Sequence, residues 1–148
     1  MPSYVLGMNA KLFYGAEDAP LAACTEITNV RDVTVNLEAG EADVTTRGNS
    51  GWRATAATLR ECTVEFQMLW NQSDSAFQAI RNAYLNAGLV RLAPLTGALA
   101  TAGSEGPFGN FSITSFSRKE SLEEGVTVDV TAKLVDWEEW IEDGAEAA

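Results

Sequence analysis

The 148-residue sequence contains no histidine, and this absence removes several kinds of chemistry. Histidine is the commonest general base near neutral pH and the commonest metal ligand in proteins. Nucleophilic sites that pair serine or cysteine with histidine are therefore excluded. Carboxylates, lysine or tyrosine could still act in catalysis, so the possible enzyme classes are narrowed but not removed.

Cysteine is scarce and long apolar runs are absent. Cys24 and Cys62 are too few for a disulfide framework, and Cys62 alternates with Val64 and Phe66 as a small buried hydrophobe would. No run of about 18 apolar residues occurs, so we expect no transmembrane helix and no membrane partner. Residues 1–9 lack a basic segment followed by an apolar run, so we expect no secretory signal and folding in a cytosol.

Basic residues are also few. Ten lysines and arginines stand against 21 acids, which gives a net charge of −11. The basic residues are scattered, and Arg118 beside Lys119 is the only adjacent pair. Such a chain repels phosphate, so it is not expected to bind nucleic acid tightly. The length and the 46% hydrophobic content predict one soluble domain that spans residues 1–148.

Two groups of acids are candidate sites. They are Glu38, Glu41 and Asp43, and then Glu120, Glu123 and Glu124. Paired carboxylates can hydrolyse glycosides, but neither group adjoins aromatics at strand spacing, so charged turns explain them better. Calcium-loop and phosphate-loop spacings are missing, including around Gly48–Gly51 and Gly103–Gly106. The sequence therefore predicts no catalytic residue, no cofactor and no metal.

Alternating apolar and polar residues predict a mainly β fold. The alternation is clear in 33–37, 62–70 and 126–134, and further strands are expected at 89–95 and 108–118. Val30 has the wrong parity for the first of these strands, which predicts a bulge near Arg31 and Asp32. Pro94 places its strand at an edge or a strand end.

One amphipathic helix is predicted over Ser73–Asn86. Ser73 or Asp74 can cap its start, and Gly88 stands where a left-handed residue ends a helix. The expected architecture is an antiparallel β-sandwich or partly rolled barrel with one flanking α-helix.

Residues 38–53 predict a long β-hairpin extension with its turn at Gly48–Gly51. Few of its residues are large and apolar, so the tip is either a solvated hairpin or a functional element. Residues 136–148 form an acidic C-terminal tail that contains Trp137 and Trp140. This tail is expected to dock either on its own domain or on a neighbouring subunit.

Much of the chain, roughly residues 4–135, resembles phage major tail proteins, the subunits of tail tubes. The segments that carry the resemblance are 27–38 (ITNVRDVTVNLE), 41–47 (EADVTTR), 51–53 (GWR), 116–118 (FSR) and 122–131 (LEEGVTVDVT). Residues after Asp136 lie outside the pattern.

The resemblance implies hexameric rings stacked into a hollow tube, with strands in a continuous inner barrel and the helix outside. It implies a virion tail assembled in the host cytoplasm, with a tape-measure protein and with terminator and tip proteins as partners. Double-stranded DNA would pass through the lumen without specific binding. A long non-contractile tail is favoured over contractile tails and tail-derived devices on this resemblance alone.

The residues themselves suggest which side chains would serve such an assembly. The expected oligomer interface consists of Glu41, Asp43, Arg47, Asn49, Trp52, Arg53, Trp137 and Trp140. The expected channel-lining residues are Thr34, Asn36, Glu65, Gln67 and Asp129, which lie on polar strand faces. A monomeric immunoglobulin-like or carbohydrate-binding module is the main alternative, and an enzyme with paired carboxylates is the second.

Overall fold

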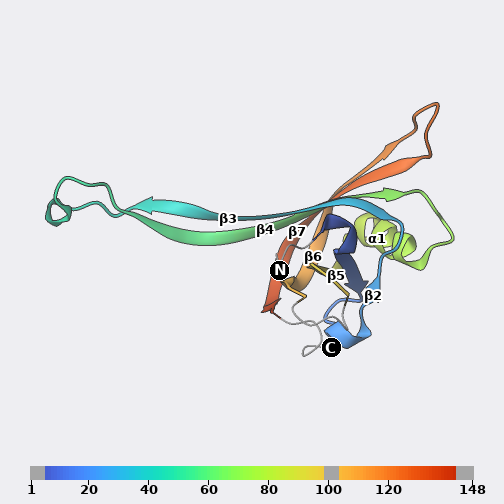
Figure 1. Cartoon of the computed structure of the whole chain (residues 1–148), viewed down its shortest axis with the longest axis horizontal. Coiled ribbons are helices and arrows are strands. Elements are labelled where there is room, and N and C mark those ends of the chain that lie inside the picture. The colour runs from blue at the N-terminus through green and yellow to red at the C-terminus, as the bar shows by residue number, and fades with distance from the viewer. Residues whose placement is uncertain (1–5, 99–103, 143–148) are drawn as a thin grey trace.

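Seven strands form one antiparallel sheet in the order β2-β1-β5-β6-β7-β4-β3, with an α-helix beside it (Figure 1). The structure is a computed structural model that describes residues 6–98 and 104–142. The strands are β1 (Lys11–Gly15), β2 (Thr25–Glu26), β3 (Val30–Asp43), β4 (Thr55–Leu69), β5 (Leu89–Leu95), β6 (Gly106–Lys119) and β7 (Thr127–Ile141). The helix is α1 (Ser75–Leu85), and the 3-10 helices are η1 (Gly7–Asn9), η2 (Leu21–Ala23) and η3 (Arg47–Asn49). The predicted mainly β class with one helix and a long hairpin is confirmed.

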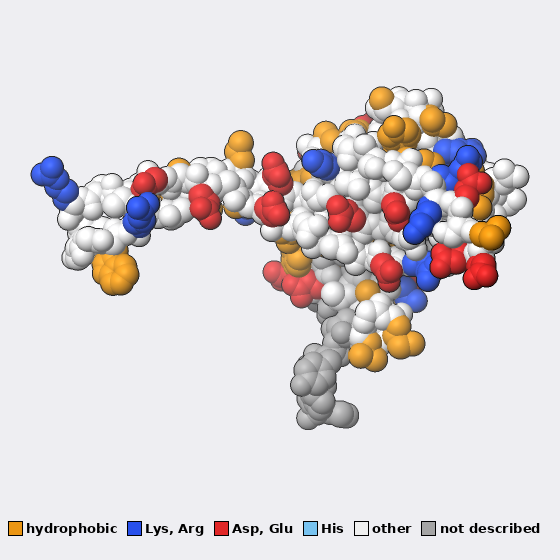
Figure 2. All heavy atoms as spheres, turned by 90° about the horizontal axis from the view of Figure 1, so that it is seen from above, with side chains coloured by type: hydrophobic (Ala, Val, Ile, Leu, Met, Phe, Trp, Pro, Cys, Tyr) orange, Lys and Arg blue, Asp and Glu red, His pale blue; other side chains and the backbone are white. Residues whose placement is uncertain are grey.

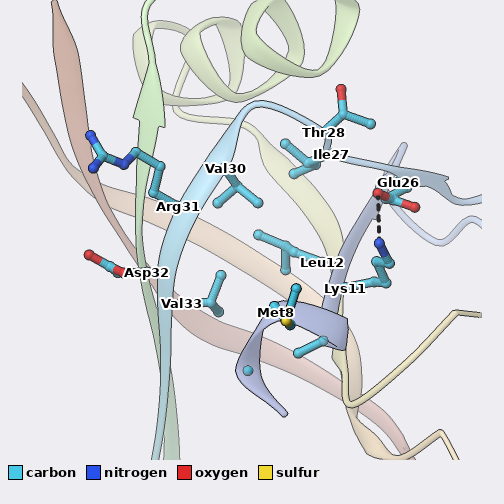
Figure 3. Close-up of a pocket in the computed structure, with 12 residues that line it drawn as sticks. Met8, Lys11, Leu12, Glu26, Ile27, Thr28, Val30, Arg31, Asp32 and Val33 are labelled. Carbon is cyan, nitrogen blue, oxygen red and sulfur yellow. Dashed lines mark ion pairs between the residues drawn. The ribbon is translucent and has the colours of Figure 1, made fainter. Parts of the chain in front are cut away.

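The sheet curls until its two edges face each other without joining. β2 and β3 are the edge strands, and residues from β1, β2 and β3 line one hollow between them. Figure 3 shows Leu12, Ile27, Val30 and Val33 gathered around this hollow, while Arg31 and Asp32 point away from it. Of the two architectures left open by the sequence, the partly rolled barrel describes the fold.

The main core lies on the concave side of the sheet. Alternate residues of β4, from Cys62 to Met68, are buried there, and so are those of β7 from Val128 to Ala132. The predicted period of two and the burial of Cys62 are therefore confirmed. A register shift between Arg31 and Val33 confirms the predicted bulge at the start of β3.

Helix α1 covers β5 and β6 and closes one side of this core. The carboxylate of Asp74 caps the helix by accepting the backbone N–H of Phe77 at 3.1 Å. Phe77 is fully buried, with its ring centroid 4.7 Å from that of Trp70. The left-handed residue after the helix is Ala87, with φ of 53°, so the prediction of Gly88 at that place was wrong by one position.

Pro94 predicted either an edge strand or a strand end. The edge position is wrong, because β5 lies in the interior of the sheet, and the strand end is right, because Pro94 is the last but one residue of β5. Its pairing with β6 ends at Leu92, whereas Pro94 still faces Leu12 of β1. The missing N–H of proline therefore costs no hydrogen bond to β6. Gly106 begins β6 beside this site, because a Cβ there would collide with the carbonyl oxygen of Pro94.

A second, smaller core lies on the opposite face of the sheet. Adjacent residues in β1 point to opposite faces, so Leu12 joins the main core and Phe13 the second one. Segment 16–24, which includes η2, covers this second core through Leu21 and Cys24. Ile141, at the end of β7, is buried in the same cluster.

Candidate assembly interface

The β3–β4 hairpin leaves the body of the molecule as a free two-stranded arm (Figure 1). β4 pairs with β7 only from Thr63 to Leu69, whereas its pairing with β3 continues outward to Asp43 and Thr55. The outer part of β4, from Thr55 to Cys62, corresponds to roughly 25 Å of strand. The predicted extension is therefore confirmed, and its outer part is not packed on the chain's own core.

The tip is ordered by its own hydrogen bonds. Asn49 and Trp52 are joined twice, because the N–H of Trp52 donates to the Asn49 carbonyl and the Asn49 amide donates to the Trp52 carbonyl. Thr45 and Ala54 bridge the two strands, with 2.8 Å from the Ala54 nitrogen to the Thr45 hydroxyl oxygen. Ser50 takes a left-handed φ of 53°, and the indole of Trp52 stays 76% exposed.

Six of the predicted interface residues gather at this tip. They are Glu41 and Asp43 on β3, Arg47 and Asn49 in η3, and Trp52 and Arg53 in the segment before β4. Within the described residues, none of their charged side chains forms an ion pair. Hydrogen bonds from the side chain and backbone of Thr45 hold the pKa of Asp43 below its ordinary value. The tip thus presents an exposed indole between unpaired charges.

The remaining two predicted interface residues lie elsewhere, at the base of the arm. Residues 136–141 continue β7 instead of forming a separate tail, and residues 143–148 lie outside the described part. Trp137 and Trp140 line a groove beside Leu37 of β3, and the Trp140 indole donates to Glu105 at 2.8 Å. Both indoles remain more than one third exposed, whereas Ile141 packs in the chain's own second core.

The predicted channel-lining residues share one face of the sheet, opposite the main core. Thr34 pairs across the strands with Glu65, and Glu65 with Thr131. The Gln67 amide donates to the Asp129 carboxylate at 3.1 Å on the same face. Asn36 and Glu65 line a polar hollow there together with Lys133. The structure brings these side chains together, and their place in a channel stays a prediction.

Among the strands that the structure describes, none pairs with the outer edge of β3. Val33, Val35 and Leu37 alternate on its apolar face, and each is more than one third exposed. A long exposed edge strand of this kind invites pairing with another chain unless something covers it. The Lys11–Glu26 ion pair, at 3.8 Å, stands on the other side of the hollow that β3 faces (Figure 3).

The structure contains one polar cluster that the sequence did not predict. Arg91 is buried in β5, with guanidinium nitrogens 3.4 Å from Asp18 and 3.6 Å from Glu138, and its charge lies over the Phe108 ring. Asn110 exchanges two hydrogen bonds with Asp18. A basic residue inside the apolar run LVRLAPL was the available signal.

Within the described residues, no group of three or more cysteines and acids is placed to hold a metal ion. No helix in that part of the chain is both long enough and apolar enough to cross a membrane.

The family model described as phage tail tube protein matches residues 11–135. The chain therefore belongs to the phage tail tube protein family, a class of structural virion proteins. The family resemblance recognised in the sequence is confirmed. Curated protein sequences gave no match to the chain.

Solved structures show the same fold in assembled particles. The tail of an empty gene transfer agent particle, refined with six-fold helical symmetry, matches with a TM-score of 0.69 and 16% identity, over 93% of this chain and 97% of that one. The SPP1 tail tube matches with a TM-score of 0.70 and 16% identity, over 91% of this chain and 80% of that one. A chain of the anti-feeding prophage baseplate matches with a TM-score of 0.61 and 6% identity, over 95% of this chain and 96% of that one. At these identities the similarity establishes a common fold.

Proposed function

We propose that this protein is the repeating, non-enzymatic subunit of a tail tube, in which copies join into six-membered rings and the rings stack. The observation that carries the proposal is the free β3–β4 arm together with the unpaired edge of β3. A single copy leaves both exposed, and joining copies around an axis would cover them. The six-fold symmetry of the similar gene transfer agent tail supports six subunits in each ring.

The polar face of the sheet would then line the lumen through which double-stranded DNA leaves the virion. Acids outnumber bases on the chain, and six copies at −11 carry −66 in each ring. Adhesion to DNA comes mainly from cationic contacts, so a surface on which acids such as Glu65 and Asp129 outnumber the single Lys133 of the polar hollow would let phosphates slide. A tape-measure protein would fill this lumen before ejection, and terminator and tip proteins would cap the ends.

Purified protein distinguishes this function from the alternatives. Negative-stain and cryo-electron micrographs should show rings, or hollow filaments whose wall is one subunit thick. Size-exclusion chromatography over a range of concentrations should show a species larger than the monomer. A β-sandwich adhesion module would instead stay monomeric at every concentration. A strictly monomeric protein would contradict the proposal.

A further inference from the structure

Segment 16–24 crosses the face of the sheet that carries the second core, and we call this segment the strap. It leaves β1 at Gly15 and returns to β2, with Leu21 and Cys24 buried against the sheet. Gly15 allows this close approach, because a Cβ there would lie 2.9 Å from the Cys24 sulfur. The strap therefore lies directly on the sheet.

Few bonds hold the strap in place. Within the described residues, its backbone hydrogen bonds close local turns, such as the one from the Ala19 N–H to the Ala16 carbonyl. Its polar link to β6 is Asp18, whose N–H donates to the Asn110 side chain at 3.0 Å and whose carboxylate accepts from the same side chain at 2.8 Å. Asp18 also takes a left-handed φ of 63°, which is held only by its surroundings. A segment with these few links can open locally at low cost.

The strap rests on a buried charge. Figure 2 shows lysine and arginine side chains on the surface at the end of the arm and over the body. Arg91 is the exception among the ten basic residues, all of which the structure describes, because it alone is buried. Its guanidinium reaches Asp18 of the strap and Glu138 of β7. Its Nε is buried without a hydrogen-bond partner in the described part of the chain. The strap and β7 thus share one desolvated cation.

The end of β7 meets the strap at this charge and in the second core. Beyond Lys133, β7 no longer pairs with β4 and keeps only its ladder with β6. A register shift leaves Glu138 without a partner on β6, as in a β-bulge, and its carboxylate lies 3.6 Å from Arg91. Ile141 is 2% exposed and packs in the same core as the strap. The two segments are therefore held by common contacts.

We propose that the strap and residues 136–141 open and close as one unit over the second core, with Arg91 and Asn110 as their common seat. Groups that share buried contacts are energetically coupled, and regions of low stability open as contiguous units. Trp137 and Trp140 lie within this unit, so the strap sets the position of two exposed indoles at the groove. By reciprocity, whatever fixes these indoles keeps the strap closed. The coupling operates within a single copy and does not depend on tube assembly.

The two native thiols measure this opening without an engineered probe. Cys24 belongs to the strap and Cys62 to the main core, and burial raises the pKa of both thiols. Each should therefore react with N-ethylmaleimide only when its surroundings open. Peptide mass spectrometry follows the two sites separately on the full-length protein. We expect Cys24 to react about tenfold or more faster than Cys62, because the unit opens without unfolding the main core.

Changes in either segment should speed the labelling of Cys24. Leu21→Ala in the strap and Ile141→Ala in β7 should each raise its rate about tenfold or more, because each leaves a cavity in the shared core. Ile141→Val removes a single methyl group and should raise the rate about threefold. The rate at Cys62 should stay the same in all three variants. Leu85→Ala, at a position of α1 that is 68% exposed, is the matched control and should change neither rate.

Hydrogen exchange measures the same unit from the other segment. Leu21→Ala should speed exchange of the amides of residues 137–141 and leave those of residues 127–133 protected. Asp18→Ala should have the same effect. Asp18→Asn should restore most of the protection, because asparagine can accept the Asn110 hydrogen bond and tolerates a left-handed φ.

Two results would overturn the coupling. Labelling of Cys24 that responds to Leu21→Ala but to neither variant of Ile141 would show that the strap moves alone. Equal acceleration at Cys24 and Cys62 would assign the opening to global unfolding. Circular dichroism checks that each variant is folded, and Ile141→Val retains the test if Ile141→Ala does not fold.

Discussion

Arg91 places a full charge where two parts of the fold meet. Its guanidinium joins Asp18, on the segment that covers the second core, to Glu138 at the end of β7. The guanidinium also lies 4.6 Å from the centre of the Phe108 ring. Both carboxylates are more than half exposed, so the cation–π contact and the packing of the side chain supply most of the stabilisation.

Replacing this side chain should therefore destabilise the second core. We expect Arg91→Ala to lower the free energy of unfolding by about 2–3 kcal/mol, because it removes buried packing and a desolvated cation–π contact. Arg91→Met should recover a large part of that loss by filling the space with apolar atoms. Urea denaturation measures both, and Arg60→Ala on the exposed arm serves as the control. Equal stability of Arg91→Ala and the parent would show that the cluster contributes nothing.

Asp43 gives the tip a dependence on pH. Hydrogen bonds from Thr45 lower its pKa in the folded state below the ordinary 3.8, so the ionised form is the one that stabilises the tip. Its contribution is present above pH 3.8 and is lost as pH falls through the lower pKa of the folded state. We expect the amide of Thr45 to stay protected from hydrogen exchange until the pH drops below that range. Protection lost near pH 5 would refute the assignment, and the same measurement on Asp43→Ala is the reference.

At the scale of elements, the arm can be changed without changing the body of the fold, so the proposed assembly can be tested separately from folding. The outer half of the arm pairs only with itself, so shortening it should leave the body of the sheet intact. We expect deletion of Gly48–Gly51 to give a folded monomer that forms no tubes. Circular dichroism and thermal unfolding report on the body, and electron microscopy reports on the tubes. Tubes of normal length from the deletion variant would show that the tip has no part in assembly.

The sequence predicted the elements well wherever one periodicity persisted. β4 and the first half of β7 alternate regularly, because one face meets the core and the other meets solvent. The end of β7 could not be predicted in the same way. Its register with β6 shifts on both sides of the Asp136–Trp137 segment, and the shifts give Trp137, Trp140 and Ile141 a spacing that imitates a helix turn. Pairing with a distant strand overrode that local pattern.

The candidate site was predicted in its parts but not in its arrangement. Exposed Trp52 and the turn at Gly48–Gly51 could be found from composition, because the segment has too few apolar residues to bury itself. The groove could not be found, since its lining comes from strands about a hundred residues apart in the sequence, such as Leu37 and Trp137. Strand parity predicted that Glu65 and Asp129 lie on polar faces. In the structure, β4 pairs with β7 so that Asp129 lies opposite Gln67, and Glu65 lies two residues away along β4 on the same face.

At the scale of the whole molecule, the sign of the charge on the polar face should control DNA passage. We expect Glu65→Lys with Asp129→Lys to slow ejection and make it sensitive to salt, because each lysine can bind phosphate. Tubes should still form, since neither residue lies on the arm tip or in the groove. Time-resolved DNA release from assembled particles measures the rate, with Glu65→Gln and Asp129→Asn as the neutral control. Unchanged release kinetics would contradict the assignment of this face to the lumen.

The outer part of the arm does not pack on its own core, and this has a consequence for the length of the proposed assembly. A contact between two different surfaces joins copies head to tail. Each added copy therefore leaves one of these surfaces free to bind the next copy. Addition along the axis of such an assembly has no natural last step. In the proposed tube, another molecule would therefore have to set the length at which growth stops.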